Sequence, residues 1–193
     1  MKFNPKLIFI PLLLALACSA ILAYVNHRTA PVIAAAGRKK ETLSARRALP
    51  PELPPPVKTN LNAVACFASF DARGKLLGVA VEGVSKNGYG GEIRVMAGFT
   101  ADGRLHDFRV LSAPGETPGL GSKIQSDAFR LPLRGRPATA GWTLKKDGGD
   151  IDAVTAATIS SRAVLEALRD AAGKWERITL KQGMINREDS TGK

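Results

Sequence analysis

The side chains best suited to chemistry in this chain are hydroxyls crowded into one short stretch. Residues 152–164 read DAVTAATISSRAV, which places two threonines and two serines at the expected start of a helix. Unpaired backbone amides and the positive end of the helix dipole stabilise a phosphate at such a position. Thr155 and Thr158 could therefore flank a free phosphate, or a phosphate bonded to a hydroxyl. The alternative is an ordinary helix cap, because hydroxyls are common at caps.

A second stretch, ETPGLG at residues 116–121, combines one proline with two glycines. The proline restricts the backbone and the glycines lack side chains, so the backbone amides of this stretch can approach a flat or anionic ligand closely. A tight turn without a ligand is the alternative, and the spacing does not decide between the two. A metal site is not indicated, because the chain has only two cysteines and two histidines and the cysteines form no ligand spacing.

Around these stretches the sequence predicts an antiparallel sheet with packed helices, which is an α+β domain. Segments rich in apolar, β-branched and aromatic residues alternate with turn-like stretches of glycine, aspartate and asparagine. They predict a meander of strands at residues 63–70, 76–84, 92–100 and 105–112, with a further strand at 142–145.

Two helices are expected after the meander. A short helix at 122–129 would be capped by Ser122, and Ser160 or Ser161 would cap a final helix through Trp175. The apolar face of the final helix would consist of Ala163, Val164, Ala167, Leu168 and Ala171.

The amino-terminal region differs in character from the rest. Residues 7–25 carry no charge for 19 residues, which at about 1.5 Å per residue is enough to cross a hydrocarbon core of roughly 30 Å. A basic stretch and the proline-rich spacer PPELPPP follow. The predicted organisation is a cytoplasmic amino terminus at 1–6, a transmembrane helix at 7–26, a basic juxtamembrane stalk and spacer at 27–56, a folded domain at 57–180 and a polar tail at 181–193.

The apolar segment has two other interpretations. Lys2 and Lys6 before an apolar run are typical of a cleaved secretory signal, and the sequence before Cys18 is an imperfect lipidation pattern. The apolar run continues for seven residues past Cys18, which favours a retained helix. The positive-inside rule, applied to the basic residues on the two sides of the segment, would place the main domain in the cytoplasm.

With 193 residues, of which 45% are hydrophobic, the chain can form one hydrophobic core of the usual size. The formal net charge of +11 favours anionic partners such as phosphates, lipid headgroups or nucleic acid. Aromatic residues make up only 6% of the chain and much of the excess charge lies in the stalk and tail, so nucleic-acid binding is not predicted.

Four motifs occur in an order that resembles the covalent-FMN-binding family. More narrowly, the chain is similar to the G subunits of the Rnf/Rsx ion-translocating electron transport complex, from the apolar segment to about Trp175. The motifs are GYGGEI at 88–93, ETPGLG at 116–121, KKDGG at 145–149 and DAVTAAT at 152–158.

The resemblance implies that FMN is attached through a phosphoester bond to the hydroxyl of Thr158. A separate flavin transferase that uses FAD and magnesium would install this bond, so the chain needs no catalytic residue or metal ligand of its own. The usual glycine of the motif is Ala156 here, which is tolerable where φ is negative. Lys123, Lys145 or Lys146 would lie near the negative charges of the flavin. The implied cofactor-binding residues are Thr158, Thr155, Asp152, Glu116, Thr117, Gly119, Leu120, Gly121 and Lys145.

The function implied by the resemblance is electron relay through covalent FMN, with the redox chemistry supplied by the flavin. The chain would be a single-pass subunit of the cell inner membrane, its main domain on the periplasmic or extracytoplasmic side, contrary to the charge count. Its complex would couple ferredoxin and NAD redox chemistry to Na⁺ or H⁺ movement, with other membrane and iron–sulfur subunits as partners. The expected apolar span has no charge, so ion conduction is expected in those subunits.

Three alternatives stay open from the sequence. The chain could be the C subunit of a Na⁺-translocating NADH:quinone reductase, which has the same flavin attachment, or a stand-alone flavinylated carrier. The non-redox alternative is a binding protein anchored by a lipid on Cys18.

Overall fold

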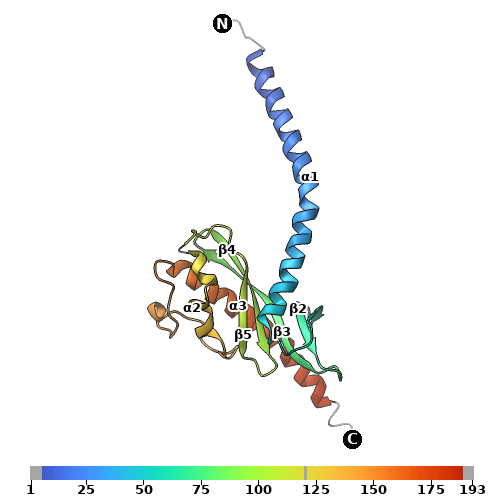
Figure 1. Cartoon of the computed structure of the whole chain (residues 1–193), viewed down its shortest axis with the longest axis vertical. Helices are drawn as coiled ribbons and strands as arrows, with labels where there is room; N and C mark the ends of the chain where they lie inside the picture. The colour runs from blue at the N-terminus through green and yellow to red at the C-terminus, as the bar shows by residue number, and fades with distance from the viewer. Residues whose placement is uncertain (1–5, 120, 189–193) are drawn as a thin grey trace. The chain divides into compact units, whose positions relative to one another are not determined.

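The computed structural model describes residues 6–119 and 121–188, and the chain divides into two compact units, Met1–Lys40 and Glu41–Lys193. Helix α1 (Lys6–Ala48) runs without a break through the described part of the first unit and into the second (Figure 1). Large apolar side chains from Phe9 to Ile33 are exposed along it. By length and composition this helix can cross a membrane. Cys18 lies inside the helix and is exposed.

The second unit is built on a five-stranded antiparallel sheet in the order β1-β2-β3-β4-β5. The strands are β1 (Val57–Leu61), β2 (Val64–Phe70), β3 (Leu76–Gly88), β4 (Gly91–Thr100) and β5 (Leu105–Ser112). The predicted α+β class and the four-strand meander are confirmed. The edge strand β1 was not predicted, because its sequence VKTNL has only two apolar residues and the strand pairs only with β2.

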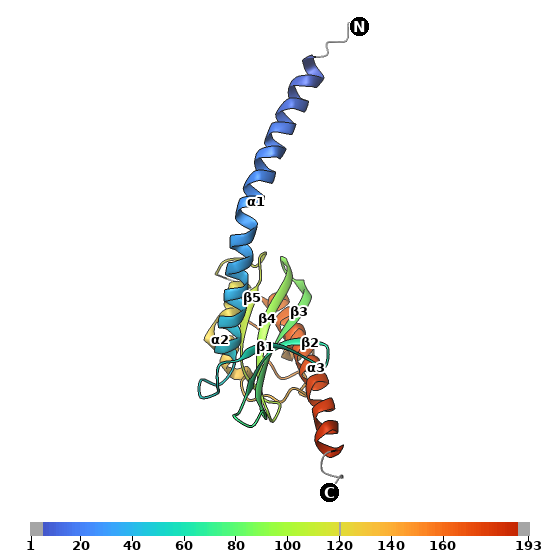
Figure 2. The ribbon, with the colours of Figure 1, turned by 90° about the vertical axis from the view of Figure 1, so that its right-hand side faces the viewer.

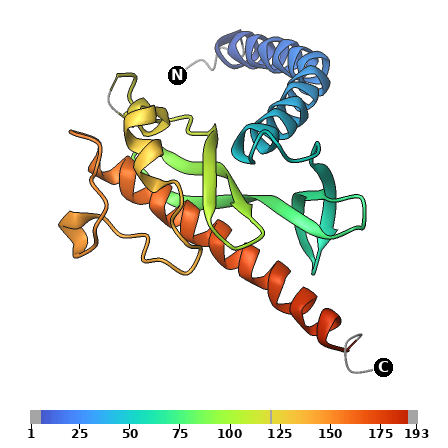
Figure 3. The ribbon, with the colours of Figure 1, turned by 60° about the horizontal axis from the view of Figure 1, so that its bottom comes forward.

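Helix α3 (Thr158–Glu188) covers one face of the sheet and forms the main core with it (Figure 3). The five residues of its predicted apolar face are all fully buried. Polar contacts also join α3 to β3: Glu166 accepts from the Ser85 hydroxyl at 2.7 Å, and Asp170 accepts from the Val84 amide at 3.0 Å. These contacts hold α3 at a fixed position along β3.

The last turns of α1 cover the other face, so that the sheet lies between them and α3 (Figure 2). Ala45, Ala48 and Leu49 are buried there against Phe67 and Met96. The domain was expected to begin near residue 57, but the compact unit begins at Glu41. Small residues let this basic segment pack closely on the sheet, and its helical spacing alone does not indicate that packing.

The proline-rich segment is fastened to the domain and does not act as a free spacer. The Arg46 guanidinium donates to the carbonyl oxygens of Leu53 (2.6 Å) and Pro51 (3.0 Å), and the Ser69 hydroxyl donates to that of Pro54 (2.8 Å). The stalk predicted at 27–56 thus divides between an exposed helix and a part of the folded unit.

Several predicted helical details differ from the structure. The segment at 122–129 forms a 3₁₀ turn η1 (Gly121–Gln125) and the short helix α2 (Asp127–Arg130), followed by η2 (Leu131–Leu133). Ser122 is no helix cap, because its hydroxyl accepts the Gly119 amide within the loop. In place of a strand at 142–145 there is one isolated bridge, Leu144 to Ile151, and the turn η3 (Lys145–Asp147).

The final helix also differs at both ends. It begins at Thr158, so Ser160 and Ser161 lie inside its first turns and do not precede it as caps. It extends beyond Trp175 to Glu188, so residues 181–188 of the expected tail are helical.

Candidate functional site

A cavity of about 390 Å³ lies where the β3–β4 turn, the loop at 116–121 and the start of α3 meet. This brings together the two stretches that the sequence singled out for chemistry. Its volume falls within the range of about 300–1,000 Å³ that is usual for small-molecule sites. The lining residues are Tyr89, Glu116, Thr117, Gly121, Ala156, Ala157, Thr158, Ile159 and Ser160.

A smaller hollow of about 250 Å³ adjoins it and is lined by Lys145, Lys146 and residues 152–156 together with Thr158. Ala156 and Thr158 line both spaces. Thr158 therefore lies between a larger cavity lined by Glu116 and a hollow lined by two lysines and Asp152.

Thr158 is the first residue of α3 and is partly exposed. Among the residues that the structure describes, its hydroxyl has no hydrogen-bond partner. The amide groups at this end of the helix and its dipole favour a negative charge nearby. The position combines a reachable nucleophilic oxygen with an environment that suits a phosphate.

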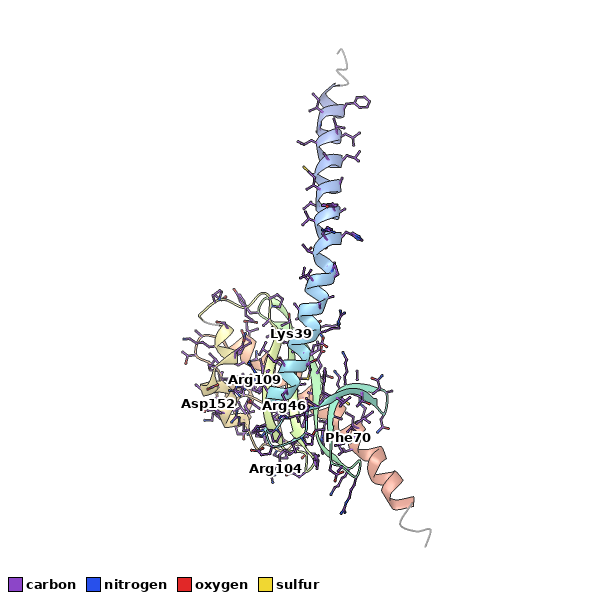
Figure 4. The ribbon with its side chains drawn as sticks, turned by 45° about the vertical axis from the view of Figure 1, so that its right-hand side comes forward. Lys39, Arg46, Phe70, Arg104, Arg109 and Asp152 are labelled. Carbon is purple, nitrogen blue, oxygen red and sulfur yellow. The ribbon has the colours of Figure 1, made fainter. Side chains whose placement is uncertain are left out.

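Lys145 lies beside the motif that contains Thr158, since its ammonium pairs with Asp152 at 2.7 Å. In the view of Figure 4, Asp152 lies on the side of the sheet-bearing unit opposite to Phe70 at the end of β2, so this motif is distant from that end of β2. Lys146 has no ion-pair partner within the described ranges, and this leaves its charge available to a ligand in the smaller hollow.

The turn that carries the two lysines is tied down by arginines. Arg162 of α3 donates two hydrogen bonds to Asp147, at 2.8 and 2.9 Å, and they lower the pKa of that carboxyl. Arg136 makes a similar pair with Asp150 at 2.7 and 2.8 Å, which lowers the pKa of Asp150 in the same way. Both carboxylates stay ionised and paired, so they hold the turn in place near α3.

Glu116 links three segments around the cavity. Its carboxylate accepts the Tyr89 amide at 3.2 Å and the hydroxyl of Ser160. A Cβ on Gly121 would lie 2.1 Å from Oε2 of Glu116, so the loop closes tightly over this carboxylate. Glu116, which the resemblance implies to be a cofactor-binding residue, thus lines the cavity and also joins its walls through these hydrogen bonds.

The serines after Thr158 have structural partners that sequence reasoning missed. The Ser161 hydroxyl donates to the carbonyl of Ala157 at 2.9 Å and accepts the amide of Val154 at 3.0 Å. It thereby fixes the backbone on both sides of Ala156, whose φ is +62°. The condition of a negative φ at Ala156 is therefore not met, and this alanine occupies a conformation that glycine adopts more readily.

The other predicted residues lie at the edges of the site. Thr155 is exposed and lines the smaller hollow with Asp152, and Lys123 lines a third hollow of about 290 Å³ that also includes Thr155. Gly119 has φ +78° and is exposed in the loop. Leu120 lies outside the described residues.

Comparison with known proteins gives the chain a family. The family model described as FMN-binding domain matches residues 88–173, which include the whole lining of the cavity. The G subunit of the ion-translocating oxidoreductase complex of Pseudomonas aeruginosa is 34% identical over 82% of this chain and 82% of its own length. The protein of the same name from Shewanella baltica is 30% identical over 84% of this chain and 85% of its own. The chain belongs to this family of G subunits. The resemblance inferred from the four motifs is thereby confirmed.

Other matches cover less of the chain or are more distant. The G subunit of Vibrio parahaemolyticus is 41% identical over 50% of this chain and 48% of its own length. Among solved structures, the crystal structure of Shewanella oneidensis NqrC matches with 22% identity and a TM-score of 0.49, covering 74% of each chain.

Proposed function

We propose that this G subunit carries FMN bonded through its phosphate to Thr158 and relays electrons within an ion-translocating oxidoreductase complex. The observation that supports it best is the position of the Thr158 hydroxyl, between a cavity large enough for a flavin ring and a hollow lined by two lysines. The match to the FMN-binding family and to the G subunits of such complexes supports the same function. These matches favour it over the quinone-reductase C subunit alternative.

The residues present fit FMN at both of its ends. The first-turn amides of α3 with Lys145 and Lys146 suit the phosphate, and the cavity beside Tyr89 and Glu116 suits the isoalloxazine ring. The bound flavin would accept and donate electrons, and the protein would fix its position. Thr117 and Gly121 would form the loop side of the cavity.

Attachment requires a separate enzyme to reach the hydroxyl. Thr155, Ala156 and Asp152 are exposed and Thr158 is partly so, which leaves the acceptor stretch accessible on the folded chain. We propose that a flavin transferase recognises this stretch and transfers FMN from FAD to Thr158. In that transfer the threonine oxygen displaces AMP from the flavin phosphate.

The amino-terminal helix would hold the protein in the cell inner membrane, with the sheet-bearing unit outside the cytoplasm. Its exposed apolar side chains support insertion into lipid. From Phe9 to Val25 the helix has no charged residue, so we assign ion movement to other subunits of the complex. The iron–sulfur and membrane subunits would be its electron-transfer partners.

The test is to produce the full chain together with a flavin transferase and to record flavin fluorescence on a denaturing gel. Wild type should fluoresce and Thr158→Ala should not, because the acceptor oxygen is gone. The control is Thr179→Ala, a threonine of the same helix whose hydroxyl bonds only to carbonyls of its own helix. Mass spectrometry should find FMN minus water on the tryptic peptide 147–162. Equal fluorescence in Thr158→Ala would refute the assignment.

A further inference from the structure

Tyr89, in the turn between β3 and β4, combines a fixed backbone with an uncovered ring. The residue lines the 390 Å³ cavity and is 68% exposed. A single exposed side chain of this kind is ordinary on a protein surface, whereas several that line one cavity fit a site that a ligand covers. Ile159 of α3 lines the same cavity and is 48% exposed. The cavity therefore presents two uncovered apolar walls that come from different elements.

The backbone of this turn is held at two points. The Tyr89 amide donates to Oε1 of Glu116 at 3.2 Å. Next to it, Gly90 packs directly on Gly115: a Cβ on Gly90 would lie 2.0 Å from Cα of Gly115, and a Cβ on Gly115 would lie 2.3 Å from Cα of Gly90. Only glycine at both positions allows this contact. The turn is thus fastened to the segment that leads into the 116–121 loop.

A tyrosine has only two side-chain torsions, so a ring on a fixed backbone costs little conformational entropy to order against a flat ligand. Tyr89 is the one aromatic residue among the described residues that line this cavity. Three other aromatic residues lie outside this cavity: Trp142 is 2% exposed in the core, the ring of Trp175 packs near Phe99, and Phe129 lines the separate hollow of about 290 Å³.

We propose that the ring of Tyr89 stacks on the isoalloxazine ring of the bound flavin and forms one wall of its site. This rests on the proposed function, because it requires a flavin in the cavity next to Thr158. The contact would position the flavin and cover one side of it against water. Tyr89 is a positioning residue in this role, and no bond to it forms or breaks.

Such a contact has an optical signature. A tyrosine in contact with a flavin donates one electron to the photoexcited isoalloxazine, and the electron returns to the tyrosyl radical in the dark, so no net oxidation takes place. The flavin fluorescence is quenched in the process. Phenylalanine is a much poorer donor but stacks in the same way, so it separates electron donation from stacking.

The experiment uses full-length flavin-loaded chains carrying Tyr89→Leu, Tyr89→Phe or, as the matched control, Tyr24→Leu in α1. Flavin per chain, fluorescence lifetime and quenching by iodide are measured for each. We expect equal flavin content, a longer lifetime in both Tyr89 variants than in wild type and the control, and easier access of iodide in Tyr89→Leu only. Because Tyr89 is exposed, the thermal unfolding temperature of the flavin-free chains should hardly change.

Equal lifetimes in Tyr89→Leu and wild type at equal flavin content would overturn the role of Tyr89 and leave attachment at Thr158 standing. If no chain carries flavin, the attachment proposal fails, and Tyr89 is then tested by titrating free FMN. In that case Tyr89→Leu should raise the Kd about two- to tenfold, as expected for loss of one aromatic contact. An unchanged Kd would overturn the inference.

Discussion

Ala156 adopts a backbone conformation that alanine disfavours, and it does so two residues before the proposed attachment point. Its φ of +62° lies in the left-handed region, where a Cβ crowds the following carbonyl. The Ser161 hydroxyl bonds on both sides of it and so holds the backbone in this conformation. The backbone strain at Ala156 therefore lies in the segment that leads into Thr158.

We expect Ala156→Gly to raise the free energy of unfolding by about 1 kcal/mol, the relief of left-handed strain less the added entropy of a glycine in the unfolded chain. The thermal midpoint should rise by roughly 2–4 °C. The control is Ala153→Gly in the same segment, where φ is not positive. It should lower the midpoint instead. If Ala156→Gly also lowered the thermal midpoint, the backbone at Ala156 would not be strained.

At the scale of elements, a buried carboxylate joins β5 to the helical turns that follow the 116–121 loop. Asp107 of β5 is 1% exposed and accepts from three arginines. They are Arg130 of α2, Arg134 at 2.7 Å and Arg109 at 3.2 Å. Arg130 is itself buried, and its pKa is raised by hydrogen bonds to Asp107 and Asp127 despite the opposing effect of burial.

Asp107→Asn should destabilise the chain by about 3 kcal/mol, because it leaves buried guanidinium charge without its carboxylate while the amide keeps one acceptor. Urea unfolding followed by circular dichroism measures the loss. Asp127→Asn is the matched control, since Asp127 pairs with the same Arg130 but has a side chain that is 73% exposed. It should have a far smaller effect. Equal losses in the two variants would show that burial at Asp107 is not the cause.

The elements were predictable from the sequence where one pattern decided them. The four strands of the meander have apolar residues between glycine-rich turns, and Ala163 to Ala171 repeat at helical spacing, so both were found. β1 and the packing of Ala45, Ala48 and Leu49 were missed, because their burial depends on partners distant in the chain. For the same reason the motifs indicated Thr158 and the 116–121 loop, whereas the hydrogen bonds of Glu116 with Ser160 and Tyr89 needed the fold.

For the whole molecule, the boundary between the two units falls inside a helix. α1 continues across residue 40, and its last turns belong to the core that includes Phe67 and Met96. A chain that keeps those turns should keep the stability of the sheet-bearing unit, and a chain that lacks them should not.

We therefore expect a chain beginning at Glu41 to unfold at the same urea concentration as the full chain, and one beginning at Val57 to lose about 3–5 kcal/mol through exposure of apolar surface. Leu49→Ala and Leu43→Ala, in the Glu41 chain, are the point-mutation counterparts. Leu49 is 2% exposed and Leu43 is 48% exposed, so only the first should be costly. Equal stability of the two shortened chains would show that the folded unit begins at residue 57 and not at Glu41.

Thr158 opens a helix of 31 residues that is packed along the sheet, so the proposed attachment point is joined to the core through α3. A flavin on a short tether from such a point has an effective concentration at its cavity of roughly millimolar or more. Weak contacts are then enough to keep the ring in place, and the cavity can stay open toward redox partners. The ring could meet a donor and an acceptor in turn without being lost from the protein.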